Sequence, residues 1–203
     1  LGCGAAIPTL RAAHGYLAAN PSHTVAVVAV EVSSAAFYIN DEPGVLISLC
    51  LFGDGAAAAI LTGDPNYDDC RSFHGFDTHH VPAEREKIRF VNSAGKLKNQ
   101  LHRSVPELAA KAVSTLYARL EKRPDQIIAH SGGRDVIEAI ESALPSFQLT
   151  ETREVLRRHG NMSSPSVLFA LEQRMQTSPQ NESLWLTAFG AGFAAHSCQF
   201  SLP

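Results

Sequence analysis

The distribution of apolar and polar residues along the chain predicts alternating helices and strands. Within residues 105–120, apolar side chains recur every four positions, at Leu108, Ala112 and Leu116, which is the spacing of an amphipathic helix. Residues 24–32 form a β-branched apolar run without alternation, as expected of a strand that is covered on both faces. The two patterns together indicate a mixed α/β fold.

The remaining segments alternate in the same way. An Ala- and Leu-rich helix is predicted over residues 5–19, because Asn20-Pro21 disfavours its continuation. Alternating elements of such lengths are typical of a layered α/β architecture. Further helices are predicted at 45–51, which we expect to be buried, 135–143, 152–158 and 164–175, and strands at 56–62, 126–129, 184–189 and 193–198, with strands and loops over 64–99.

Composition and charge limit the classes of partner. The 203 residues are 45% hydrophobic, enough for a sizeable core, and 17 basic against 20 acidic residues show no charge run typical of a nucleic-acid or membrane surface. No apolar stretch approaches the roughly 20 residues of a membrane-spanning helix. Because its four cysteines form no CxxC pair, we predict neither a zinc site nor a disulfide framework, and a reducing cytoplasm is the simplest location. We expect a small molecule or another protein as partner.

Cys3, in the segment GCGAA, stands at the start of the first predicted helix. A helix N-terminus carries partial positive charge, which favours a thiolate, so Cys3 is a candidate nucleophile. The alternative is an inert, buried, small side chain, which is the more frequent role of such a cysteine. This segment alone leaves both interpretations open.

Two polar residues occupy positions where α/β proteins often place chemistry. His130 follows the predicted strand 126–129 and precedes two glycines that let a ligand approach the backbone. Asn161 precedes the last predicted helix, where it could donate a hydrogen bond to an oxyanion while Ser163 or Ser164 caps the helix. A histidine that stabilises a local turn and an asparagine that only caps a helix are the alternatives. The other histidines lack such a setting, and no metal site is predicted.

Five segments, taken in order, resemble the motifs of the type III polyketide synthases, the chalcone synthase family of the thiolase superfamily. They are GCGAA, LFGDGAAAAIL, IIAHSGG, HGNMSSPSVLFAL and FGAG, and they extend from the first residues to about Gly192. The resemblance implies a thiolase-like α/β/α/β/α fold. Residues 1–63 would be the end of the first thiolase half, with the nucleophile helix, and residues 64–203 the complete second half.

The resemblance also implies roles for individual residues. Cys3 would take an acyl group from a CoA thioester, and His130 and Asn161 would form the oxyanion site that promotes decarboxylation of malonyl-CoA, with His130 paired to the cysteine as an imidazolium. FGDGAA would be a structural turn whose two glycines can take positive φ. The substrate pocket would include residues Gly132, Gly133, Phe73 and Ala191.

Two segments depart from the family pattern. Ala191 stands where the family usually has proline, and residues 95–101 are polar where plant members place an aromatic gatekeeper. These departures concern the starter acyl group and the cyclisation of the product. They favour a bacterial-type relative over a plant chalcone synthase.

The resemblance implies substrates and assembly as well. Acyl-CoA and malonyl-CoA would be the substrates, no cofactor would be permanently bound, and basic contacts to CoA and much of a homodimer interface would lie upstream of residue 1. A ketoacyl-ACP synthase III-like enzyme that performs a single condensation is one alternative function. A catalytically silent thiolase-fold subunit that serves as an assembly partner is the other.

Overall fold

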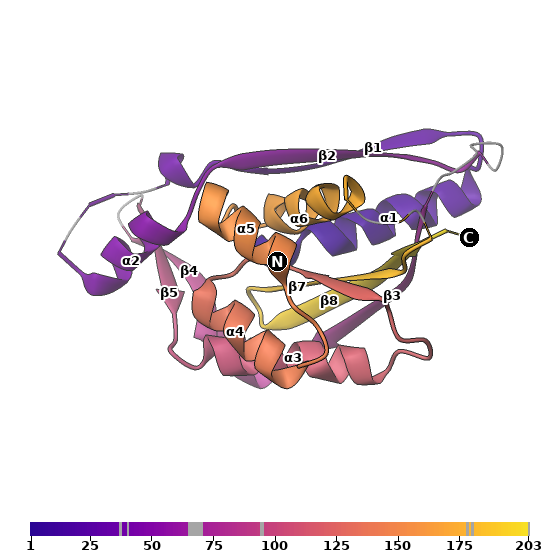
Figure 1. The fold of residues 1–203 in the computed structure, drawn as a ribbon. Helices are drawn as coiled ribbons and strands as arrows, with labels where there is room; N and C mark the ends of the chain where they lie inside the picture. Colours follow the sequence, from indigo (N-terminus) through magenta and orange to yellow (C-terminus); the bar gives the residue numbers. More distant parts are fainter. Residues whose placement is uncertain are drawn as a thin grey trace.

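The protein is described by a computed structural model over residues 1–36, 38–39, 41–64, 71–93, 96–177, 179 and 181–202. Its elements alternate as the sequence pattern predicts, and they stack in layers (Figure 1). In order they are η1 (Gly2–Gly4), α1 (Ala6–Ala19), β1 (Thr24–Glu31), η2 (Ser33–Ala35), α2 (Pro43–Leu51), β2 (Gly55–Thr62), β3 (Ser72–His80), η3 (Pro82–Lys87), β4 (Ile88–Ser93), β5 (Lys96–Leu101), α3 (Val105–Ala118), β6 (Gln126–Ala129), α4 (Arg134–Ala143), α5 (Thr150–His159), α6 (Pro165–Met175), β7 (Leu184–Gly190) and β8 (Ala194–Ser201).

The central sheet has the strand order β3-β8-β7-β6, in which only β6 and β7 run parallel. Every residue of β7 is buried, because the sheet is covered on both faces. Leu186 and Ala188 point into a core shared with α1, α5 and α6, whereas Trp185 and Phe189 point into a second core shared with α3 and α4. The sheet therefore lies between two helical layers (Figure 1).

A second sheet, the antiparallel pair β1–β2, covers the outer side of α1 and α6 (Figure 1). Val27 and Ala59 on its inner face pack into the first core. On its outer face Val28, Val30 and Ile60 are 58%, 56% and 71% exposed, so the expectation that β1 is covered on both faces is wrong for the described residues. The alternation in burial comes from the pleat, which the uniformly apolar sequence did not indicate.

The predicted elements are confirmed, with one further correction that concerns the burial of a helix. The helix expected at 45–51 is α2, but Leu46 and Ile47 are exposed, so it is not a buried helix. The polar region 64–99 contains β3, β4 and most of β5, as the expectation of strands and loops implies. Cys70 lies outside the described residues. The division at residue 63 stays a prediction, since the first core takes residues from both sides of it. None of the helices described here is long and apolar enough to cross a membrane.

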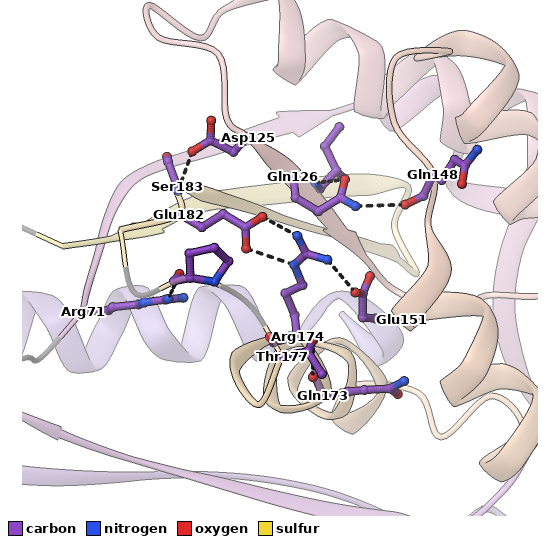
Figure 2. Close-up of polar contacts among 12 residues, drawn as sticks. Arg71, Asp125, Gln126, Gln148, Glu151, Gln173, Arg174, Thr177, Glu182 and Ser183 are labelled. Carbon is purple, nitrogen blue, oxygen red and sulfur yellow. Dashed lines mark hydrogen bonds and ion pairs between the residues drawn. The ribbon is translucent and has the colours of Figure 1, made fainter.

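A polar network ties α5 and α6 to the segment that enters β7 (Figure 2). Arg174 donates from Nε to Glu182 Oε2 at 2.9 Å and from Nη1 to Glu151 Oε1 at 3.0 Å, and its Nη2 also pairs with Glu182. Beside it, the Ser183 N–H donates to Asp125 Oδ2 at 2.8 Å. The network fixes the start of β7 against β6. It lies at the opposite end of these strands from the candidate site described next.

Candidate active site

Cys3 lies in the short turn η1, immediately before α1. This turn packs directly on the end of β7, because glycines remove the side chains that would separate the two backbones. A Cβ atom at Gly4 would lie 3.2 Å from the carbonyl carbon of Phe189, and one at Gly190 would lie 2.0 Å from the Leu1 oxygen. The backbone contact therefore positions the cysteine beside the β7–β8 turn.

Burial is the largest influence on the pKa of the Cys3 thiol. Its side chain is half-buried, and desolvation raises the pKa of the thiol, with a smaller contribution in the same direction from the negative charge of Glu31. The Ser163 side chain acts in the opposite direction and lowers the pKa of the thiol, but it does not outweigh burial. Desolvation therefore opposes the effect expected of the helix N-terminus and favours the thiol in the free site.

His130 follows β6 and is held by the backbone on both sides. Its N–H donates to the Thr187 carbonyl at 2.9 Å, its carbonyl accepts from the Gly132 N–H at 3.0 Å, and the ring packs edge-on against Phe189 at 5.6 Å between centroids. Only 1% of the residue is exposed, and desolvation lowers the pKa of His130 to about 4. The imidazole is therefore neutral near pH 7, which contradicts the expected imidazolium.

Asn161 is fixed by hydrogen bonds at both ends. Its backbone N–H donates to Leu51 O at 2.8 Å, and its side-chain Oδ1 accepts from the Ser163 N–H at 2.8 Å. Because an N–H donor requires an oxygen opposite it, this bond orients the amide so that Nδ2 points to Gly132 O, 3.3 Å away. An amide has two N–H groups, so one stays available to an oxygen of a substrate.

These contacts join the three candidate residues into one site. Ser163 lies next to Cys3, whose pKa its side chain lowers. The Ser163 N–H donates to Asn161 Oδ1, Asn161 Nδ2 donates to the Gly132 carbonyl, and the Gly132 N–H donates to the His130 carbonyl. The three side chains come from three distant segments: η1, the end of β6 and the loop before α6. The structure therefore brings the predicted residues together.

Close backbone packing, rather than positive φ, explains the glycines of the FGDG segment. Neither Gly53 nor Gly55 has positive φ, so that expectation is wrong. A Cβ at Gly53 would instead lie 2.1 Å from the His159 oxygen, and one at Gly55 would lie 2.5 Å from Met162 Sδ. These contacts press the loop that carries Asn161 against the start of β2, which confirms a structural role for the segment.

Ser163 belongs to the site, although the sequence indicates it only as a possible helix cap. Neither Ser163 nor Ser164 caps α6 with its side chain, whereas Ser166 Oγ accepts from the Met162 N–H at 3.0 Å. Ser163 has φ 59°, an uncommon conformation for a residue with a side chain. The adjoining Gly160 and Asn161 in HGNMSS, which allow a sharp turn, were the available signal.

A cavity of about 210 Å³ adjoins the site and has Ser163 in its wall. Its other walls are mainly apolar, with Val45, Leu49 and Phe52 on the α2 side and Phe90 on the β4–β5 hairpin. A Cβ on Gly2 would lie 3.9 Å from Phe90, so this lining residue lies close to the turn that carries Cys3. Within the part of the chain that the structure describes, no cluster of His, Cys, Asp and Glu could hold a metal ion.

The four expected pocket residues differ in their placement. Gly132 contacts the His130 ring region, since a Cβ there would lie 3.5 Å from His130 Cδ2, and Gly133 begins α4 with φ 147°. Ala191 lies in the β7–β8 turn beside η1. Phe73 instead packs on Phe200 with tilted rings, 4.6 Å between centroids, at the end of the sheet where β7 starts. The structure does not bring Phe73 to the other three.

Two family comparisons cover almost the whole chain. Residues 1–120 match the family described as "FAE1/Type III polyketide synthase-like protein" and residues 80–195 match "Chalcone and stilbene synthases, C-terminal domain". The chain belongs to the type III polyketide synthase family. Its layered architecture is accordingly the thiolase-like fold of that family.

Individual relatives agree with this assignment. A putative chalcone synthase from Bacillus subtilis is 30% identical over 99% of this chain and 60% of its own length. A crystal structure of PKS-I from the brown alga Ectocarpus siliculosus superimposes with a TM-score of 0.90 at 23% identity, over 100% of this chain and 59% of that chain. CsyB complexed with CoA-SH gives 0.84 at 21% identity, over 100% and 63%. This type III polyketide synthase chain thus spans about 60% of the length of these relatives.

Proposed function

We propose that this chain carries the condensing site of a type III polyketide synthase, which joins a Cys3-bound acyl group to malonyl-CoA by decarboxylative Claisen condensation. The observation that supports this most directly is the position of Ser163, which lowers the pKa of Cys3 and is bonded to Asn161, while Asn161 is bonded to Gly132 beside His130. CoA in the related CsyB structure supports CoA thioesters as substrates. Assembly as a homodimer and a cytoplasmic location stay predictions.

The first step is acyl transfer to Cys3. Because the free site favours a thiol and a neutral imidazole, His130 would take the thiol proton as the sulfur attacks the thioester carbonyl. The new sulfur–carbonyl bond forms while the bond to the CoA sulfur breaks, and CoA leaves with a proton. A neutral histidine suits this base role better than an imidazolium, which has no free lone pair.

The second step is decarboxylation of malonyl-CoA. The carbon–carbon bond to the carboxylate breaks, CO2 leaves, and the electron pair forms an enolate whose negative charge lies on the thioester oxygen. Asn161 Nδ2–H and the His130 ring are the candidate donors to that oxygen, and their burial makes each hydrogen bond stronger than in water. The enolate carbon then attacks the acyl-cysteine carbonyl, the new carbon–carbon bond forms, and Cys3 leaves as the thiolate.

Intact-mass spectrometry tests the role of Cys3. Incubation with an acyl-CoA should add one acyl mass that maps to Cys3, and addition of malonyl-CoA should release a condensed product. We expect Cys3→Ala to abolish both results, and Cys50→Ala, which changes an exposed cysteine, to preserve them. Acylation at Cys50 instead, or equal labelling of the two cysteines, would refute the assignment.

Product analysis separates the enzymatic alternatives. A single extension by malonyl-CoA would favour the ketoacyl synthase reaction, and several extensions would favour a polyketide synthase. A folded chain that neither accepts an acyl group nor decarboxylates malonyl-CoA would favour the silent assembly subunit.

A further inference from the structure

His196 on β8 lies beside the short turn η1, which carries Cys3. Its ring approaches the turn at Gly4, the residue after the cysteine, since a Cβ atom added to Gly4 would lie 3.1 Å from His196 Cδ2. Gly4 is buried, and the same added atom would lie 3.2 Å and 3.3 Å from the backbone of Phe189 and Gly190. The turn is therefore packed against both the backbone of β7 and the ring of His196.

The neighbouring strand β3 holds the His196 ring in one orientation. Thr78 Oγ1 is hydrogen-bonded to His196 Nδ1 at 3.0 Å, and the His80 ring packs edge-on against the His196 ring with 6.2 Å between centroids. Only 4% of His196 is exposed, and burial lowers the pKa of His196 to about 4, so the ring is neutral near pH 7. A fixed, neutral ring can set the position of the backbone that packs on it.

A role in joining β3 to β8 does not account for a histidine at this place. Another histidine–hydroxyl pair, His74 Nε2 with Ser201 Oγ at 3.0 Å, joins the same two strands at their other end. His196 leaves its own Nε2 buried without a partner among the described residues, which lowers the stability of the fold. An apolar side chain would fill the same space without this cost, so the contact with the nucleophile turn favours a role in the reaction.

We propose that His196 is a positioning residue for the condensing reaction, whose ring holds Gly4 and so keeps the Cys3 sulfur in place. This inference rests on the proposed function. The sulfur must meet His130 and Asn161 in one geometry, and a displacement of about 1 Å can slow such a reaction by about 10²-fold. A small alkylating reagent reaches a thiol without this alignment. Loss of the ring should therefore slow acylation of Cys3 far more than its alkylation.

Acylation kinetics of variants at His196 test the proposal. With hexanoyl-CoA as the probe, we expect His196→Ala to lower the saturating rate of Cys3 acylation by about tenfold. The half-saturating concentration should stay unchanged, because the residues described as lining the cavity beside Cys3 do not include this ring. Alkylation by iodoacetamide should change little. His196→Asn should restore most of the rate, since its amide atoms can occupy the places of Nδ1 and Cδ2. Thr78→Val, which removes the bond but leaves the ring, should give an intermediate rate.

A matched control and a measurement without acylation separate this test from that of the proposed function. His74→Ala removes the other histidine–hydroxyl pair and should keep the acylation rate per folded molecule. Hydrogen exchange of the η1 amides, two of which bond within the turn at 3.1 and 3.0 Å, should be faster in His196→Ala than in His74→Ala.

Two results would overturn the positioning role even if the unaltered chain acylates Cys3 normally. One is equal exchange of the η1 amides in His196→Ala and His74→Ala. The other is a loss of alkylation in His196→Ala as large as its loss of acylation. An unaltered chain that leaves Cys3 unmodified would instead refute the proposed function, and this inference with it.

Discussion

Two largely buried polar clusters lie at opposite ends of strands β6 and β7, and they differ in how completely their groups are paired. Around Arg174, where β7 begins, the guanidinium binds two carboxylates, and only Glu151 Oε2 among these groups has no partner in the described chain (Figure 2). At the carboxyl end of β6, His130 Nδ1, Ser131 Oγ and Thr187 Oγ1 are all buried without a partner among the described residues.

This difference distinguishes a polar cluster that stabilises the fold from one that forms a binding or catalytic site. A paired network stabilises the fold, and its polar atoms are satisfied by the protein itself. Unpaired buried groups lower the stability of the fold. They are expected at sites where a ligand or a transition state supplies the missing hydrogen-bond partner. The position agrees, because α/β proteins place ligands beyond the carboxyl ends of parallel strands.

Removing an oxyanion donor should give the largest effect on the unpaired cluster. We expect Asn161→Ala to slow malonyl-CoA decarboxylation by about 10²–10³-fold, the usual cost of one such donor. The measurement is the rate of CO2 release from malonyl-CoA with and without Asn161→Ala, both in the Cys3→Ala variant, in which no condensation reaction competes. Thermal unfolding serves as the control, since Asn161 also binds the Ser163 N–H. A rate that falls only in proportion to the folded fraction would make Asn161 a structural residue.

Breaking the paired cluster should affect stability alone. Arg174→Met leaves Glu151 and Glu182 as uncompensated, largely buried carboxylates, and we expect it to lower the free energy of unfolding by about 3 kcal/mol. Denaturant titration measures this loss. The decarboxylation rate per folded molecule should stay unchanged. A selective loss of rate would contradict the structural role.

The stability of the folded chain should fall as the pH is lowered from 7 to 5. The unfolded chain binds a proton at His130 near pH 6.5, whereas the folded site resists it until about pH 4, so protonation favours unfolding in this window. His130 alone should contribute about 2 kcal/mol between pH 7 and 5. Urea titrations at several pH values measure the slope, and His130→Gln should reduce it. Burial also lowers the pKa of His196 to about 4, so His196 should account for the pH dependence that remains in this variant.

The smallest effect should come from the link between Cys3 and the Asn161 loop. Ser163→Ala removes the hydroxyl that lowers the pKa of Cys3, so the thiol should be harder to deprotonate and alkylation by iodoacetamide at pH 8 should slow by about two- to tenfold. Ser164→Ala, whose hydroxyl makes no cap hydrogen bond, is the matched control. Equal alkylation rates in the two variants would show that Ser163 does not act on the thiol.

The sequence predicted the order of the elements, the family and three residues that the structure brings together. It did so because helix periodicity, turn residues and short motifs are local properties. It did not predict the role of Ser163, the position of Phe73 at the other end of the sheet, or the exposed outer face of β1–β2. Each of these depends on which distant segment packs against the residue in question.

The amino-acid sequence alone indicates that a cysteine, a histidine and an asparagine follow one another in segments typical of condensing enzymes. Their protonation depends on the folded structure. Helix position alone favoured a thiolate at Cys3, but packing against β7 and the nearby Glu31 raise its pKa, and burial beside Phe189 keeps His130 neutral. The physical reason is that the cost of a buried charge depends on all surrounding groups, most of which lie far away along the chain.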